Sequence, residues 1–153
     1  MNGVFNYHWG FDKMHRIITK IFIIFIRNIM NNIQKRFILF LLGCIPARLA
    51  LVYLAKNISI EYLPILGYIT LIMGISFAYL YLSGTRETGP EVFGDKIWWN
   101  NLRPIHAIFY IIFSYNAINK IRGGWIYLLY DVIFGLFSFL IFHYINNDFK
   151  NLI

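Results

Sequence analysis

Two residues of opposite charge, Arg48 and Asp131, interrupt long apolar runs of this sequence. Charged side chains inside a membrane segment usually face the helix bundle and pair with one another, because hydrocarbon cannot solvate them. Arg48 lies seven residues before its run ends near Ala55. Asp131 lies seven residues after the point near Gly124 where its run begins. Each residue then lies about 10 Å below the same membrane surface, which predicts an ion pair between two helices.

Polar residues in two further apolar runs offer hydrogen bonds to this pair. Tyr68 in the second run and Asn116 in the third fall at about the depth of the two charges. A buried charge is stable when its hydrogen-bonding capacity is met. The four side chains therefore predict a polar layer about one third of the way into the bilayer. Further polar residues at this level are Thr70, Ser114 and Tyr115.

The charged pair has three interpretations. The favoured one is an assembly lock that holds the helices in register. In the second, the pair lies on a path for a substrate, a proton or another ion. In the third, Arg48 acts alone and extends its charged head to the membrane surface.

Two histidines fall on one side of the predicted membrane, His106 near the start of the third run and His143 near the end of the fourth. Two imidazoles on one side raise the hypothesis of a shared ligand such as haem or a metal ion. No carboxylate motif supports them, so anchoring of helix ends at the interface is the favoured interpretation. We expect no cofactor and no metal.

Other reactive residues do not form a recognisable catalytic pattern. Glu87, Glu91 and Asp95 repeat every four residues, but Gly89 and Pro90 disfavour the helix that would align them. Cys44 is the single cysteine and has no base at a recognisable spacing. No G-x-S-x-G, H-E-x-x-H or GK[ST] motif occurs. The sequence gives no positive indication of an enzyme.

The composition identifies the elements that must position these residues. Hydrophobic residues make up 59% of the 153 and charged residues 14%, against about 25% charged in soluble proteins. A soluble chain of this length could not bury so much apolar surface. The net charge is +7, but the basic residues lie at the ends of apolar runs and form no single stripe. We therefore expect contact with lipid and no contact with nucleic acid.

Four apolar runs are candidates for membrane spans, which predicts an all-α protein with an antiparallel four-helix transmembrane bundle. The first run gives about 28 Å of helix, close to the ~30 Å hydrocarbon thickness, and Pro46 is expected to kink it. The third gives only ~24 Å and is short for a crossing. Gly67, Gly74 and Ala78 form a small-residue face on the second, suited to close helix packing. The predicted spans are 37–55, 60–82, 104–119 and 125–144.

The rest of the chain flanks this transmembrane domain, which we place at 37–145. The region 1–36 is basic, and Lys20 and Arg27 lie on one face of an apolar stretch, which predicts an interfacial helix. Met30 is an alternative start to Met1. The segment 146–153 is a polar tail.

Basic residues are distributed unequally between the two sides of this predicted topology. With the N-terminus inside, ten lysines and arginines fall on the inner side and three on the outer. Because cytoplasmic loops carry the excess of such residues, both termini and the loop at 83–103 are predicted on the cytoplasmic-equivalent side. The inner set is Lys13, Arg16, Lys20, Arg27, Lys35, Arg36, Arg86, Lys96, Arg103 and Lys150, and the outer set is Lys56, Lys120 and Arg122.

Four segments carry a resemblance in their order along residues 38–144: LGCIPARLALVYLA, YLPILGY, GDKIWWNNLRPIHAIFY and WIYLLYDVIFGL. Together they resemble small uncharacterised membrane proteins of large DNA viruses of algae and protists. The resemblance implies a four-span topology and a viral origin. It implies no activity and no site residues.

Together these observations predict an integral membrane protein that acts as a structural or assembly component, of a host or virion membrane. One alternative is a small oligomeric transporter or channel that uses Arg48 and Asp131. Another is a haem-binding redox protein that uses His106 and His143. The expected partners are the lipid bilayer and further copies of the chain.

Overall fold

The computed structural model describes residues 30–89, 92–93 and 96–152 of the chain. Within these ranges the regular structure is helical, and a single isolated β-bridge joins Thr88 to Lys96. The predicted interfacial helix of the N-terminal region falls mainly on residues 1–29 and lies outside the described residues.

The first helix is one continuous stretch of 26 residues, Asn32–Asn57. It consists of α2 (Asn32–Ile38), a π-helical turn η1 (Leu39–Cys44) and α3 (Ile45–Asn57). The helix begins five residues before the predicted span, because Asn31 and Gln34 form a capping box that satisfies its first backbone donors. The wide turn directly precedes Pro46, which has no backbone N–H to donate.

The second and third helices form a hairpin. Helix α4 (Leu63–Ser83) carries a proline in its first turn and ends at Gly84, which adopts a left-handed conformation with φ of 60°. Helix α5 (Arg103–Ile118) follows a short 3₁₀ turn, η3 (Asn100–Leu102). Both proline-containing starts agree with the preference of proline for the first helical turn.

The last helix, α6 (Trp125–Ile145), agrees with its predicted span at both ends. It is preceded by the 3₁₀ turn η4 (Arg122–Gly124) and followed by η5 (Asp148–Asn151). The η5 segment attaches to the start of α2, because Asn31 Nδ2 donates to the carbonyl oxygen of Asn151 at 2.7 Å.

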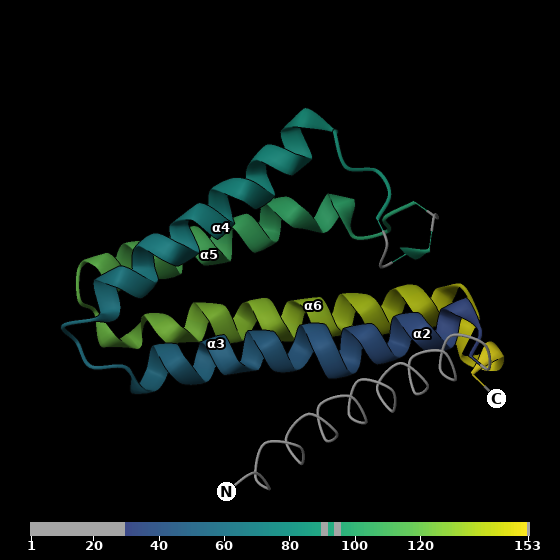
Figure 1. Cartoon of the computed structure of the whole chain (residues 1–153), viewed down its shortest axis with the longest axis horizontal. Helices are drawn as coiled ribbons and strands as arrows, with labels where there is room; N and C mark the ends of the chain where they lie inside the picture. The colour runs from purple at the N-terminus through teal and green to yellow at the C-terminus, as the bar shows by residue number, and fades with distance from the viewer. Residues whose placement is uncertain (1–29, 90–91, 94–95, 153) are drawn as a thin grey trace, which may run out of the picture.

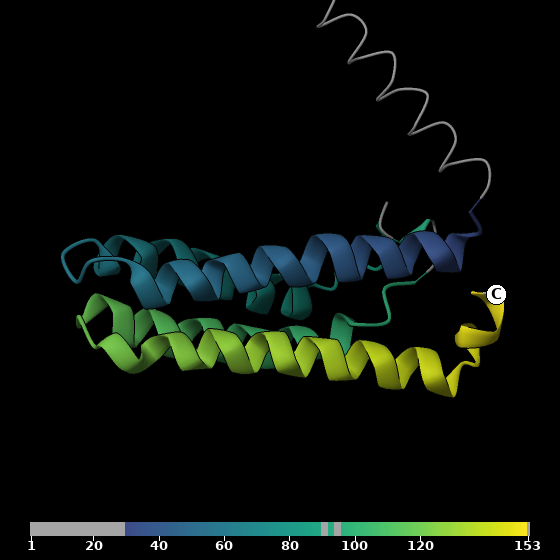
Figure 2. The same cartoon turned by 90° about the horizontal axis from the view of Figure 1, so that it is seen from below.

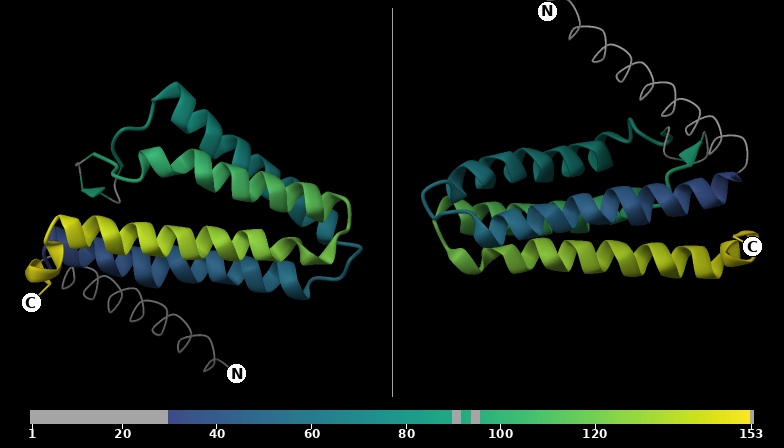
Figure 3. Two further views of the ribbon diagram at one scale, coloured as in Figure 1. Left: turned by 180° about the vertical axis from the view of Figure 1, so that it is seen from behind. Right: turned by 60° about the horizontal axis from the view of Figure 1, so that its bottom comes forward.

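The helices form two antiparallel pairs (Figure 1). The α2–η1–α3 helix lies beside α6 over its length (Figure 2), and α4 lies beside α5. The start of α2, the segments 84–89 and 96–102 and the end of α6 lie at one end of the molecule, called the loop end below (Figure 3). The turns 58–62 and 119–124 lie at the opposite end, called the turn end. Helix α4 diverges from α6 toward the loop end.

The α4–α5 hairpin packs through small residues. A Cβ on Gly67 would lie 2.9 Å from Ile118 Cγ1, and one on Gly74 would lie 3.0 Å from Ile111 Cγ1. These distances leave no room for a side chain, so the two glycines permit the close approach of the helices. Both are buried, as the predicted packing face requires, and Ala78 on the same face is partly buried.

Three helices of the described chain are long and apolar enough to cross a membrane: Asn32–Asn57, Leu63–Ser83 and Arg122–Ile145. Helix α5 has 16 residues and does not reach that length by itself. The predicted all-α class is confirmed for the described residues.

Candidate functional site

The predicted ion pair is present and has a third member. Asp131 on α6 is buried, with 1% of its side chain exposed. Arg48 Nη1 on α3 donates to Asp131 Oδ2 at 2.7 Å. His106 Nδ1 on α5 contacts the other carboxylate oxygen, Oδ1. These three residues, called the ion cluster below, join three helices from both antiparallel pairs.

The chemistry of the three groups fixes their hydrogen-bond roles. Arginine carries its positive charge at any pH that a folded protein meets, and an ionised carboxylate only accepts hydrogen bonds. With Asp131 ionised, His106 Nδ1 is the donor in its bond to Oδ1. Arg48 Nη1 lies 3.2 Å from the same nitrogen, so two donors converge on one carboxylate. With neutral His106 the cluster has a net charge of zero.

The surroundings of the ion cluster exclude most solvent. The exposed fraction of the side chain is 18% for Arg48 and 6% for His106. Gly135 on α6 lies beside both, and a Cβ there would lie 3.5 Å from Arg48 Nη1 and from His106 Cε1. Charge-assisted hydrogen bonds are strong in such low-dielectric surroundings.

A pair of hydroxyls links α4 to α5. Thr70 Oγ1 and Ser114 Oγ lie 2.9 Å apart, and both side chains are fully buried. Each hydroxyl also lies within hydrogen-bond distance of carbonyl oxygens of its own helix, including Leu66 O for Thr70 and Tyr110 O for Ser114. These contacts give both buried hydroxyls hydrogen-bond partners.

Tyr68 and Asn116, the two other members of the predicted polar layer, do not contact the ion cluster. Tyr68 is 57% exposed, because it lies about 100° around α4 from the buried Gly67 face. Thr70, three residues after Gly67, occupies that face instead. Asn116 lies near the turn end of α5, where its amide donates to Ile112 O at 2.8 Å. The structure therefore places His106 in the position that we expected Tyr68 and Asn116 to fill.

The two histidines of the shared-ligand hypothesis occupy separate sites. His143 Nδ1 lies 2.6 Å from Asp148 Oδ2, while His106 contacts Asp131. Asp131 and His143 are twelve residues apart on α6, or about 18 Å along the helix axis. Within the described residues, no three His, Cys, Asp or Glu side chains are grouped so that they could hold a metal ion.

His106 is the site residue that the depth argument missed. Counted from the turn end, His106 lies twelve residues from the last residue of α5 and Asp131 six residues from the first residue of α6, so the count places His106 about 9 Å deeper. A signal was present in the periodicity of α5. His106 shares one helix face with Tyr110, Phe113, Ser114 and Ala117, all of which are buried.

Comparison of the chain with models of protein families, with curated proteins and with solved structures finds no match. The resemblance to viral membrane proteins stays a prediction.

Proposed function

We propose that the chain is an integral membrane protein with four spans, of which α5 is the third. Helix α5 and the preceding turn η3 together cover 19 residues. They give about 30 Å of helical length, 24 Å of α-helix and 6 Å of 3₁₀-helix, which matches the hydrocarbon thickness. The tight packing of α5 against α4, a helix long enough to cross the membrane, supports a spanning position for α5.

Exposed aromatic residues at both ends of the helices support this placement. Tyrosine and tryptophan are enriched where hydrocarbon meets the lipid headgroups. Exposed tyrosines near the turn end are Tyr53, Tyr62 and Tyr115, and those near the loop end are Tyr79, Tyr81 and Tyr144. We propose that the loop end faces the cytoplasmic-equivalent side, since it carries more lysine and arginine than the turn end.

The function that the geometry supports best is that of a structural or assembly component of a membrane. One observation carries this proposal: both oxygens of Asp131 are occupied, one by Arg48 and one by His106. Arg48 balances the charge of Asp131 and His106 occupies its second oxygen, so the cluster joins three helices and specifies how they fit together. Such a role in fixing register is the best-attested use of buried polar groups.

Transport is a second candidate function, and one observation favours it. Arg48 retains 18% exposure of its side chain, and an imidazole, the side chain most often used in proton shuttles, lies 3.2 Å from it in His106. Buried ionisable groups of this kind occur on proton and substrate paths of membrane carriers. A carrier would use the cluster as a binding site that opens to one side at a time.

Reconstitution into liposomes separates the two functions. The wild-type protein and its Asp131→Asn variant are compared for proton flux, for anion flux and for thermal stability in the same lipid. The structural proposal predicts no flux above that of empty liposomes and a lower melting temperature for the variant. A proton or anion flux that disappears in Asp131→Asn, with the melting temperature unchanged, would instead establish a carrier.

The matched control is Asp148→Asn, which removes a carboxylate of another His–Asp pair on the same chain. It leaves the ion cluster intact and is expected to keep the wild-type melting temperature within a few degrees.

The copy number of the protein in its membrane gives an independent measurement. Quantitative mass spectrometry of the source membrane should find the protein among its abundant components, and a trace amount would contradict a structural role.

A further inference from the structure

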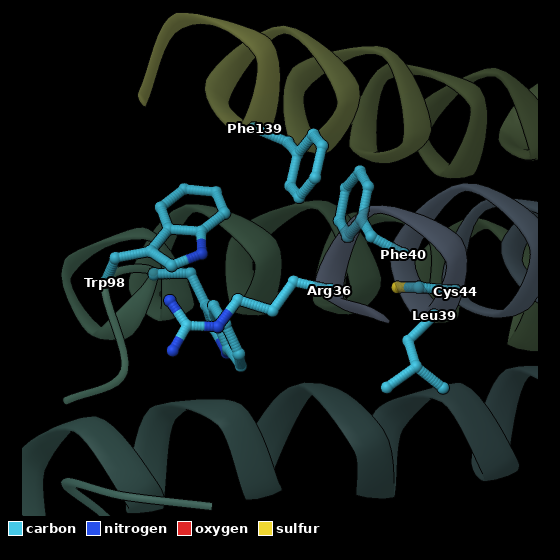
Figure 4. Close-up of a pocket in the computed structure, with 7 residues that line it drawn as sticks. Arg36, Leu39, Phe40, Cys44, Trp98 and Phe139 are labelled. Atoms are coloured by element: carbon cyan, nitrogen blue, oxygen red, sulfur yellow. The ribbon is translucent and has the colours of Figure 1, made fainter. Parts of the chain in front are cut away.

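A cavity of about 240 Å³ lies between the first helix and the segment that leads into α5. Its walls combine the side chains of six residues seen in Figure 4 with that of Trp99. Leu39, Phe40 and Cys44 come from the π-helical turn η1, and Phe139 comes from α6. Arg36 and Trp98 close the cavity at the loop end.

The cavity has an apolar body. The rings of Phe40 and Phe139 are stacked with centroids 4.0 Å apart and form one wall. Trp98 stacks on Phe142 at 4.6 Å, which holds its indole beside the cavity. The volume equals about eight water molecules, but apolar cavities hold water poorly and bind apolar ligands.

The guanidinium of Arg36 lies at the loop end of the cavity. Arg36 Nη2 donates to Val92 O at 2.7 Å, and this bond keeps the guanidinium at the cavity wall. Cys44 lies eight residues further along the helix, about 12 Å deeper along its axis. The cavity therefore runs from a positive charge at the headgroup level into the hydrocarbon level.

The wide turn η1 is an independent feature of the same place. Three of the seven lining residues belong to it. π-Helical turns inside α-helices are rare and occur frequently at functional sites. Here the turn brings Leu39, Phe40 and Cys44 to the cavity at the point where α4 has diverged from α6.

We propose that this cavity binds one acyl chain of an anionic phospholipid from the loop-end leaflet, with the lipid phosphate beside Arg36. The apolar walls take the chain, the guanidinium takes the phosphate, and the paired indoles of Trp98 and Trp99 lie at the glycerol level. The proposal adds a lipid site to a membrane protein and does not depend on whether the ion cluster is structural or conductive.

Cys44 provides a built-in probe, because it is the single cysteine of the chain and lines the cavity. The purified full chain in micelles is labelled with N-ethylmaleimide while phosphatidylglycerol, phosphatidylcholine or oleate is added. We expect phosphatidylglycerol to slow labelling in a saturable manner, with half-protection at a concentration about tenfold lower than for phosphatidylcholine. A tenfold difference in affinity corresponds to the free energy of about one charge-assisted hydrogen bond.

The variant Arg36→Gln keeps a donor for Val92 O and removes the charge. It should abolish the preference for phosphatidylglycerol while protection by the acyl chain persists. Lys35→Gln is the matched control, since it removes the neighbouring charge, which lies over the Phe93 ring, and should retain the preference. Equal protection by the two phospholipids, or equal loss of preference in both variants, would overturn the assignment of the headgroup.

Two further outcomes bear on the proposal. Protection by oleate without protection by phosphatidylglycerol would assign the site to a free fatty acid and overturn the phospholipid. Native mass spectrometry of the wild-type protein needs no variant to fold, and it should find one phosphatidylglycerol retained per chain from a mixed micelle. The absence of any retained lipid, together with unprotected Cys44, would refute the site.

Discussion

Two histidine–aspartate pairs occupy different depths of this molecule and differ in what surrounds them. In the ion cluster, His106 contacts Asp131, whose side chain is 1% exposed. At the loop end, His143 contacts Asp148, whose side chain is 17% exposed. Only the deeper carboxylate has an arginine as a further partner among the described residues.

This difference shows how the free-energy cost of burying a carboxylate depends on its access to water. Asp131 cannot be hydrated, so its negative charge must be balanced by Arg48 and its second oxygen must find another donor. Asp148 retains contact with solvent and requires no cation. The same two residue types therefore join α5 to α6 at one site and η5 to α6 at the other.

The histidine of the more exposed pair is itself the more deeply buried of the two histidines. His143 is fully buried, and its Nε2 has no hydrogen-bond partner in the described structure. Its ring is surrounded by aromatic side chains, with centroids 4.3 to 6.0 Å away. The aromatic neighbours are Phe37, Trp98, Phe139 and Phe142. His143 thus contributes mainly as one more ring in an aromatic cluster.

Replacing Asp131 by asparagine should have the largest effect of a conservative substitution. It leaves the partly buried Arg48 without its counter-charge, which costs about 3–5 kcal/mol of unfolding free energy. Asp148→Asn removes the same group from the loop-end pair and should cost about 1 kcal/mol or less, because water replaces the lost interaction. Reversible unfolding in mixed micelles measures both values.

Similar losses of unfolding free energy in the two aspartate variants would contradict the difference proposed between the two pairs. They would mean that exposure does not distinguish the two carboxylates. Circular dichroism before unfolding is the control that both variants begin from the same helical content.

Replacing each histidine by phenylalanine should give a smaller difference in unfolding free energy between the two pairs. His106→Phe leaves one oxygen of a buried carboxylate without a donor, at a cost of about 1–3 kcal/mol. His143→Phe keeps a ring among aromatic neighbours but loses the contact with Asp148, so its effect should stay near that of one ordinary hydrogen bond, about 1 kcal/mol or less. A greater loss in His143→Phe would indicate that the Asp148 bond stabilises the fold more than the rings do.

The smallest effect is expected for the uncharged polar contact between α4 and α5. Thr70→Val removes the hydroxyl that lies 2.9 Å from Ser114 Oγ and keeps the shape of the side chain. Hydrogen bonds between membrane helices are worth about 0.6 kcal/mol on average. A double-mutant cycle with Ser114→Ala measures the coupling, and a value as large as that of Asp131 would remove the distinction between charged and neutral contacts.

The sequence was sufficient to predict the charged pair, because an arginine and an aspartate inside apolar runs have few other solutions. Helix α6 was also predictable to within one residue at each end, since Gly123 and Gly124 precede it and polar residues follow it. The start of the first helix was missed, although Asn31 and Gln34 carry a capping signal in the sequence.

The third member of the cluster could not be found by counting depth. The side chains of His106 and Asp131 meet although their residue counts from the turn end differ by six, so equal counts do not mean equal height in neighbouring helices. The choice between Tyr68 and Thr70 was decidable in principle from the sequence. Gly67, Thr70 and Gly74 recur at helical spacing on one face, and Tyr68 does not share it.

The coupling free energy between Arg48 and Asp131 tests the central claim most directly. The variants Arg48→Asp, Asp131→Arg and their combination are unfolded in the same micelles as the wild-type protein. If the two residues form the lock between α3 and α6, each single exchange is strongly destabilising, and the double exchange recovers about 2 kcal/mol or more of the summed loss. Additivity of the two exchanges to within about 0.5 kcal/mol would contradict the pairing, and with it the proposal that this cluster assembles the helices.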